Sequence, residues 1–144
     1  MNYVAYAAGF LLSPDMSRVA LVRKKRPKWQ AGLFNAVGGH VELGETALQT
    51  MRREFAEEAG LDVEDWRHDA DLTGPDFSVA FFSARGSHDG LLSLTDEEVS
   101  SEAVVDVLAG RLPQMRNLRL LLALALDDSG LMLPVALLDS GARP

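Results

Sequence analysis

The segment from Thr46 to Ala59 combines an apolar stripe with an acidic face, and this combination constrains the fold more than any other feature of the chain. Apolar residues recur in it at the three- and four-residue spacing of a buried helix face, at Leu48, Met51, Phe55 and Ala59. Gly60 then suits a helix end. Glu54, Glu57 and Glu58 stand at i, i+3 and i+4, so their carboxylates project from one face within about 5–6 Å of one another. We therefore expect a helix that packs on one side and turns three acids into a cleft.

Three carboxylates this close repel one another, so the arrangement costs stability unless a positive charge lies between them. Hard oxygen ligands in such a cluster suit Mg²⁺ or Mn²⁺. Arg53, four residues before Glu57, is placed to hold a carboxylate, and Thr46 or Glu45 lies where the helix N-terminus needs a cap or a negative charge. The other interpretation, a solvated acidic face, is weakened because 46–59 contains no lysine to pair with the acids. Residue types and spacing alone thus favour a divalent-metal site.

The rest of the chain is typical of an α/β (α+β) fold, a mixed β-sheet covered by helices. The patterns predict strands over 3–12, 18–23, 33–37, 66–73 and 77–84, and helices over 46–59, part of 97–108, and 115–127. Turn residues at 13–15 indicate that the first two strands form a hairpin. A chain of 144 residues is long enough for one compact core, so we expect a single domain over 1–144.

The absence of cysteine excludes a disulfide framework, a thiolate metal site and a cysteine nucleophile. It is consistent with an intracellular protein, and we expect a cytoplasmic one. The two most apolar runs, 4–12 and 118–126, are too short to cross a bilayer, and the first lacks the basic lead-in of a targeting segment. We expect the first run to be a buried strand, and we expect no membrane association.

The formal net charge of −7 argues against stable nucleic-acid binding, which depends on basic residues that neutralise phosphates. The basic residues are nevertheless unevenly placed, and five of the fourteen fall in one short segment: Arg23, Lys24, Lys25, Arg26 and Lys28. Two interpretations of this segment remain open. It contacts a small phosphorylated ligand, or it is a solvated turn whose charges keep a sheet edge soluble.

Residues 39–61 resemble the signature of the Nudix hydrolase family. That signature is a glycine, five residues, a glutamate, seven residues, Arg-Glu, an aliphatic residue, any residue, Glu-Glu, any residue, a glycine and an aliphatic residue. It falls without a gap on Gly39, Glu45, Arg53, Glu54, Glu57, Glu58, Gly60 and Leu61. Phe55 is the one departure, an aromatic residue where an aliphatic one is usual, and it affects only packing under the helix. A pattern with this many fixed positions is highly specific.

The resemblance implies an α/β/α sandwich and a hydrolase for phosphoanhydride bonds. The implied substrate is a nucleoside diphosphate linked to another group, attacked by water with the assistance of Mg²⁺ or Mn²⁺. Carried over position by position, the resemblance makes Glu54, Glu57 and Glu58 metal ligands. Glu54 or Glu57 is then also the base, and Arg53 and Glu45 orient the set.

Two further metal contacts follow from the same resemblance. The glycine pair before the helix lets the backbone approach a metal or a phosphate closely, and the carbonyl of Gly38 or Gly39 is an expected oxygen donor, with Gly39 chosen. Many members of the family also take an acid from a downstream loop, where this chain has Asp96, Glu97 and Glu98. Glu97 or Glu98 is expected in that role, with Glu98 chosen. An acidic first turn of the next helix explains these residues equally well.

The expected partner is a nucleotide-type small molecule, and a homodimer is left open. Substrate contacts are predicted in the basic segment and at two nearby aromatic residues: Arg23, Lys25, Arg26, Trp29 and Phe34. Pro75, fifteen residues past Gly60, is a one-residue match to ADP-ribose-cleaving members, and the signatures of NADH- and coenzyme-A-cleaving members are absent. We therefore expect a nucleoside triphosphate as the substrate. The alternatives are an ADP-ribose or nucleotide-sugar pyrophosphatase and a non-catalytic nucleotide-binding module.

Overall fold

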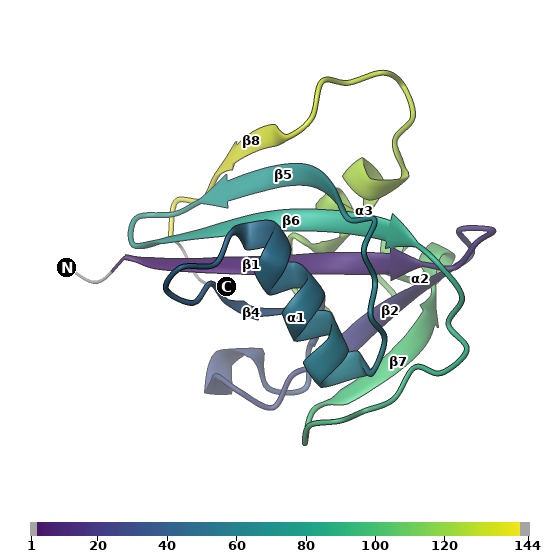
Figure 1. Cartoon of the computed structure of the whole chain (residues 1–144). Coiled ribbons are helices and arrows are strands. Elements are labelled where there is room, and N and C mark those ends of the chain that lie inside the picture. Colours follow the sequence, from purple (N-terminus) through teal and green to yellow (C-terminus); the bar gives the residue numbers. More distant parts are fainter. Residues whose placement is uncertain (1–2, 142–144) are drawn as a thin grey trace.

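A computed structural model describes residues 3–141, which form an eight-stranded mixed sheet with helices on both faces (Figure 1). The strand order is β3-β2-β1-β6-β5-β8, with β4 paired to β1 and β7 paired to β2. The strands are β1 (Val4–Leu12), β2 (Arg18–Arg23), β3 (Phe34–Asn35), β4 (Val37–His40), β5 (Arg67–Thr73), β6 (Phe77–Arg85), β7 (Glu98–Ala103) and β8 (Val135–Leu138). The helices are α1 (Ala47–Ala59), α2 (Val104–Leu108) and α3 (Leu118–Leu126), and η1 (Lys28–Gln30) is a 3₁₀ turn. This architecture confirms the predicted fold class.

β1 lies at the centre of the sheet, and its alternating side chains supply two hydrophobic cores. Phe10 and Leu12 face one side of the sheet, while Ala7 and Leu11 face the other. β1 pairs in parallel with β6 along its whole length and antiparallel with β4. A strand buried on both faces has no polar side to alternate with its apolar one, which explains the nearly continuous apolar run at this end of the sequence.

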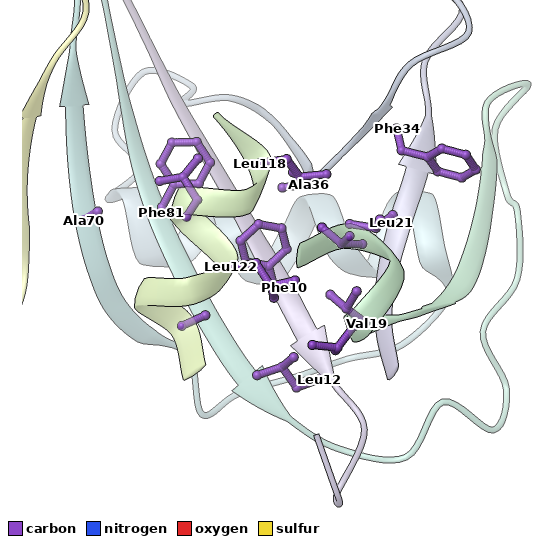
Figure 2. Packing of buried hydrophobic residues seen from close by; sticks show 14 of the residues in the cluster. Phe10, Leu12, Val19, Leu21, Phe34, Ala36, Ala70, Phe81, Leu118 and Leu122 are labelled. Carbon is purple, nitrogen blue, oxygen red and sulfur yellow. The ribbon is translucent and has the colours of Figure 1, made fainter. Parts of the chain in front are cut away.

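The first core lies under α2 and α3. Phe10 and Phe81 of the central strands pack there with Leu118 and Leu122 of α3, and Leu21 extends the layer toward α2 (Figure 2). Three of the six leucines in α3 are thereby explained, because Leu118, Leu121 and Leu122 are buried in this core. Within residues 3–141, no helix has the length and hydrophobicity that crossing a membrane requires.

The second core lies under α1, which crosses the opposite face of the sheet (Figure 1). Met51, Phe55 and Ala59 are fully buried, and the Phe55 ring meets Trp66 edge-on at 5.3 Å. The aromatic departure from the family pattern is therefore a core residue. The predicted stripe is wrong at Leu48, which is 46% exposed in the first turn of the helix. Thr50 is buried instead, and the hydrogen bond from its hydroxyl to Glu45 offsets the cost of burying a polar group.

Three stretches of the sheet differ from the sequence-based expectation. The single strand expected over 33–37 is divided into β3 and β4, and β4 continues through Gly38 and Gly39. Residues 98–103 were expected to be partly helical but form β7, and α2 begins only at Val104. β7 carries mostly polar residues and is held by antiparallel pairing with β2 along its whole length. β8 was not predicted; it pairs in parallel with β5 at the edge of the sheet. The partner strands of β7 and β8 are distant in sequence, so no local pattern reveals either pairing.

Candidate functional site

Both ends of α1 are fixed by residues that the sequence identifies. Thr46 Oγ1 accepts a hydrogen bond from the Gln49 amide at 3.1 Å, and Gln49 Oε1 accepts one from the Thr46 amide at 2.9 Å. This reciprocal pair is a capping box. At the other end Gly60 adopts a left-handed conformation, with φ of 79°, and closes the helix as predicted. A helix capped at both ends and buried on one side holds its acidic face in a fixed place.

Arg53 lies among the carboxylates of this face and binds several of them at once. Its Nε and Nη2 donate to the two oxygens of Glu45 at 2.8 and 2.9 Å, a bidentate contact. Its Nη1 donates to Glu54 at 2.9 Å and to Glu57 at 3.2 Å, and Nη2 also reaches the His40 carbonyl at 3.2 Å. The hydrogen bond from Arg53 is the main reason that the pKa of Glu45 is lowered to about 2. One guanidinium therefore fixes the positions of three carboxylates.

Gly39 provides space for the carboxylate of Glu54. A Cβ atom at Gly39 would lie 2.4 Å from the Glu54 carboxyl carbon, closer than any real Cβ contact. The Glu54 carboxylate thus lies directly against the backbone of β4, beside the peptide group expected to act as an oxygen donor. The neighbouring Gly38 is needed for a different reason: a Cβ there would lie 2.1 Å from the Ala7 carbonyl oxygen on β1.

The three glutamates of α1 occupy three different environments. Glu57 is 57% exposed, Glu54 is 17% exposed, and Glu58 is buried. Burial and the negative charge of Glu54 raise the pKa of Glu58 to about 8. Its Oε2 atom is buried and has no hydrogen-bond partner. The positive charge of Lys24 offsets burial and the charge of Glu54 only in part, and this favours protonation of Glu58 or a bound cation.

The downstream acid beside this cluster is Glu97. Glu97 is buried, and its negative charge acts on Glu58. Glu98 is exposed at the start of β7, where it lies across the sheet from Arg23. The choice of Glu98 as a metal ligand therefore stays a prediction. Its side chain lies at the surface, as that of Glu57 does, whereas the side chain of the preceding residue, Glu97, is buried.

The basic segment forms one wall of a hollow of about 420 Å³. Arg23, Lys24 and Lys25 line it together with Asp96 and Glu98. A second hollow of about 420 Å³ lies between α2 and α3, is mostly apolar, and is on the sheet face opposite α1. Its composition and place separate it from the carboxylates.

The five predicted substrate contacts are in different environments. Arg23 and Lys25 line the hollow, and Arg26 is ion-paired with Asp96. Trp29 is 46% exposed on η1. Phe34 is instead a core residue, buried beneath the Arg23 guanidinium at 5.2 Å, so the prediction that it contacts the substrate is corrected. Its ring belongs to the first core, at the side of the cluster away from α3 (Figure 2).

The oxygen atoms of Glu54, Glu57, Glu58 and the Gly39 carbonyl suit a divalent cation, although the Arg53 guanidinium contacts both Glu54 and Glu57. Among residues 3–141, no three His, Asp or Glu side chains form a ready-made metal cluster. Two observations nevertheless fit a cation. Glu58 has a buried oxygen without a partner, and Gly39 leaves the Glu54 carboxylate beside a backbone carbonyl. Carboxylate and carbonyl oxygens are the ligands that Mg²⁺ and Mn²⁺ prefer.

Sequence reasoning missed the ion pair between Lys24 and Glu97. The two residues are 73 positions apart, and Lys24 Nζ donates to Glu97 Oε1 at 2.9 Å. Lys24 appeared only as one member of a basic run, and nothing in its local sequence sets it apart from Lys25. Thr50, whose hydroxyl donates to Glu45 at 2.8 Å, was missed because it lies outside the signature positions.

Comparison with known proteins gives a consistent result. A model of the NUDIX domain matches residues 4–118. The human mitochondrial NAD(P)H pyrophosphatase NUDT13 is 36% identical over 64 residues, which are 44% of this chain and 18% of that protein. The oxidized purine nucleoside triphosphate hydrolase of Danio rerio is 51% identical over 47 residues, which are 33% of this chain and 30% of that protein. The match thus spans less than a third of the length of either relative.

Solved structures show the same fold. A MutT structure from a study of the Aliivibrio salmonicida and Vibrio cholerae proteins superimposes with a TM-score of 0.74 and 21% sequence identity. The superposition covers 87% of this chain and 98% of that one. At this identity the likeness concerns the arrangement of strands and helices, and the assignment of chemistry depends on the site itself.

Proposed function

The chain belongs to the NUDIX domain family, and we propose that it is a pyrophosphohydrolase that uses Mg²⁺ or Mn²⁺ to cleave a phosphoanhydride bond of a nucleoside triphosphate. The observation that carries this proposal is the crowding of acids on α1. Arg53 holds Glu45, Glu54 and Glu57, while Glu58 is buried without a partner for one oxygen. A polyanionic substrate approaches such a site only if metal ions lie between it and the acids.

The residues that would hold the metal are Glu54, Glu57, Glu58 and the Gly39 carbonyl. When bound, the metal supplies positive charge to the phosphates and acidifies a water molecule. Arg53 keeps Glu54 and Glu57 at fixed positions through hydrogen bonds of 2.9 and 3.2 Å, so little reorganisation is required.

Glu57 is the residue to which we assign proton acceptance. It is the most exposed of the three acids of α1, at 57%, and a hydrogen bond from Arg53 at 3.2 Å holds its carboxylate. The oxygen of a water molecule forms a bond to phosphorus, the bond from phosphorus to the bridging oxygen breaks, and pyrophosphate leaves with the electron pair. The proton of the water passes to the Glu57 carboxylate, so the products are a nucleoside monophosphate and pyrophosphate.

The basic wall supports a substrate with several phosphates. Arg23, Lys24 and Lys25 line the hollow, and the charge of Lys24 also acts on Glu58, so a cationic surface lies near this acid. Similarity to the hydrolase of oxidized purine nucleoside triphosphates favours this substrate class. Similarity to an NAD(P)H pyrophosphatase supports a second candidate, a dinucleotide or another substrate such as ADP-ribose in which a diphosphate joins two groups.

A panel of substrates with Mg²⁺, read by product identity, tests the proposal. Nucleoside triphosphates should give pyrophosphate and a nucleoside monophosphate. A dinucleotide or ADP-ribose that is cleaved faster, with release of AMP and a second phosphorylated product, would favour the second candidate. Ligand-dependent stabilisation with no product from any substrate would identify a non-catalytic binding module.

Glu57→Gln isolates the role of the carboxylate. The variant should lower kcat by about 10²–10⁴-fold, the contribution of a positioned base, with little change in melting temperature because Glu57 is exposed. Glu64→Gln is the matched control, since Glu64 is an exposed acid paired with Arg52 away from the cluster. Equal turnover by the two variants would refute the assignment of Glu57.

A further inference from the structure

Glu97 is a buried carboxylate that holds a distant segment of the chain. It is 5% exposed, its Oε1 accepts a hydrogen bond from Lys24 Nζ at 2.9 Å, and its Oε2 accepts one from the Lys25 amide at 2.6 Å. The Arg26 amide adds a longer contact to Oε2 at 3.4 Å. Although burial opposes ionisation, these partners hold the pKa of Glu97 below its ordinary value. Both oxygens of this side chain are therefore engaged by protein donors.

The loop before Glu97 is attached to the end of α1. The amides of Leu92 and Leu94 donate to the carbonyls of Ala59 and Glu58, each at 3.0 Å. These bonds satisfy carbonyl groups that a helix C-terminus leaves without partners. The Glu97 amide is bonded in turn to Thr95 Oγ1 at 3.2 Å. The position of Glu97 relative to the acids of α1 is thus set by backbone contacts.

The segment held by Glu97 lines the hollow, and its charge reaches one of the acids of α1. Lys24 and Lys25 both line the hollow, and the charge of Lys24 also acts on Glu58, where it opposes the effect of Glu97. Breaking the contacts of Glu97 would leave an ammonium group and two amides without their acceptor, and hydrogen bonds to a charged group are stronger than those between neutral groups. The geometry therefore favours a Glu97 carboxylate that keeps its contacts with the basic segment, and not one that leaves them to bind a metal.

We propose that Glu97 is a positioning residue that holds Lys24 and Lys25 as a basic wall beside the α1 carboxylates. The phosphate chain of a nucleotide then meets cations on one side and the metal-binding acids on the other. This inference depends on the proposed function for its ligand, and it assigns the downstream acid a new role. Glu97 acts on substrate binding through the two lysines, and not as a metal ligand.

Amide exchange in the metal-free protein tests the first half of the proposal. NMR would follow the Lys25 and Arg26 amides in the wild type, Glu97→Ala, Glu97→Gln and the control Glu102→Gln, an acid on β7 outside the site. Glu97→Ala should speed exchange at both amides by about tenfold or more, because it removes their acceptor. Glu97→Gln keeps an acceptor oxygen and should show a smaller increase, while Glu102→Gln should match the wild type. Unchanged exchange in Glu97→Ala overturns the proposal, and Glu97→Gln serves the same purpose if Glu97→Ala does not fold.

Calorimetry on the same proteins tests the second half. The probes are Mg²⁺ alone and an α,β-methylene nucleoside triphosphate in the presence of Mg²⁺. Glu97→Gln should weaken nucleotide binding about tenfold, although it removes a negative charge, and should leave Mg²⁺ affinity within about twofold. With a hydrolysed substrate, KM should rise while kcat stays within about threefold. A tenfold loss of Mg²⁺ affinity would show instead that Glu97 is a metal ligand.

The two proposals fail in distinguishable ways. Wild-type protein that binds the nucleotide analogue but hydrolyses no substrate contradicts the proposed function, and the exchange and binding results still decide the role of Glu97. Hydrolysis with normal nucleotide affinity in Glu97→Gln contradicts the positioning role alone. A wild type that binds no nucleotide contradicts both.

Discussion

At the scale of single residues, the same side chain acquires different properties from its surroundings. Glu54, Glu57 and Glu58 are identical in sequence terms, yet one lies against a glycine, one is exposed, and one is buried with a pKa raised to about 8 by burial and by Glu54. Spacing on a helix predicts that the three share a face. It does not predict burial, because that depends on the loop that covers the end of α1.

Gly39→Ala is the substitution that most directly tests how Glu54 is placed. The new methyl group would overlap the Glu54 carboxylate, whose atoms lie 2.4–2.7 Å from its position, so the carboxylate must move. We expect activity to fall by about a hundredfold, the cost of displacing a reacting group by roughly 1 Å. Circular dichroism should show an intact fold, because the displaced atoms are the end of a flexible side chain.

Gly86→Ala is the matched control for that substitution. A Cβ at Gly86 would meet only Leu11 Cδ1 at 3.4 Å, an ordinary contact. This variant should retain wild-type activity. If Gly39→Ala is equally active, then a close approach of Glu54 to the backbone is not required for catalysis.

At the scale of secondary-structure elements, α1 depends on its N-terminal cap. Thr46→Ala removes the acceptor for the Gln49 amide and should lower the free energy of unfolding by about 1 kcal/mol. Chemical denaturation would measure this change. Leu43→Ala, at a fully exposed position in the preceding loop, should leave the free energy of unfolding unchanged. An equal loss in both variants would indicate that the loop, and not the cap, stabilises the start of the helix.

The turn between β1 and β2 should make stability depend on pH. The Ser17 amide and hydroxyl and the Ser13 hydroxyl donate to Asp15, and the Ser17 amide is the main cause of a pKa lowered from 3.8 to about 2. A carboxylate with a lowered pKa stabilises the fold above its unfolded value, and the contribution is lost as the pH falls through the folded value. Asp15→Ala should therefore melt a few degrees below the wild type at neutral pH.

The difference in melting temperature between the wild type and Asp15→Ala should narrow as the pH falls from about 4 toward about 2. Thermal unfolding at several pH values would measure it. Asp89→Ala is the control, because Asp89 is an exposed loop residue bonded to Ser87 through its backbone amide. A stability gap for Asp15→Ala that stays constant across this range would show that the charge of Asp15 is not involved.

Elements also show what the sequence can and cannot predict. β1, β2, β5, β6 and α1 were predicted within one or two residues, because their apolar periodicity and end signals are local. β7 and β8 were not, because their sequences carry weak patterns and their stability comes from pairing with β2 and β5. The sequence narrows the downstream acid to Glu97 or Glu98 and favours Glu98. Which of the two side chains is buried depends on where β7 begins, and no local pattern indicates that point.

At the scale of the whole molecule, the sheet separates a face that serves packing from a face that also carries the acid cluster. α2 and α3 bury one face of the sheet, and α1 covers the other and carries the acids (Figure 1). The signature at 39–61 predicted the acid cluster and its orienting arginine because it is one continuous stretch. The basic wall and its carboxylate come from segments more than 70 positions apart, so only the assembled sheet brings them together.

The central claim is that the carboxylates of α1 repel one another and destabilise the fold unless a divalent cation is bound. Thermal unfolding at about pH 9, with and without Mg²⁺, tests this claim most directly. At this pH Glu58 is ionised in the metal-free protein, because its pKa in the folded state is about 8. This pKa is raised by folding, so the stability that the protonated side chain contributes at low pH is lost as the pH rises through about 8. Mg²⁺ should raise the melting temperature of the wild type by several degrees. Metal-free Glu58→Gln should melt above the metal-free wild type and respond little to Mg²⁺. Equal responses of the two proteins to Mg²⁺, or no response in either, would contradict the account.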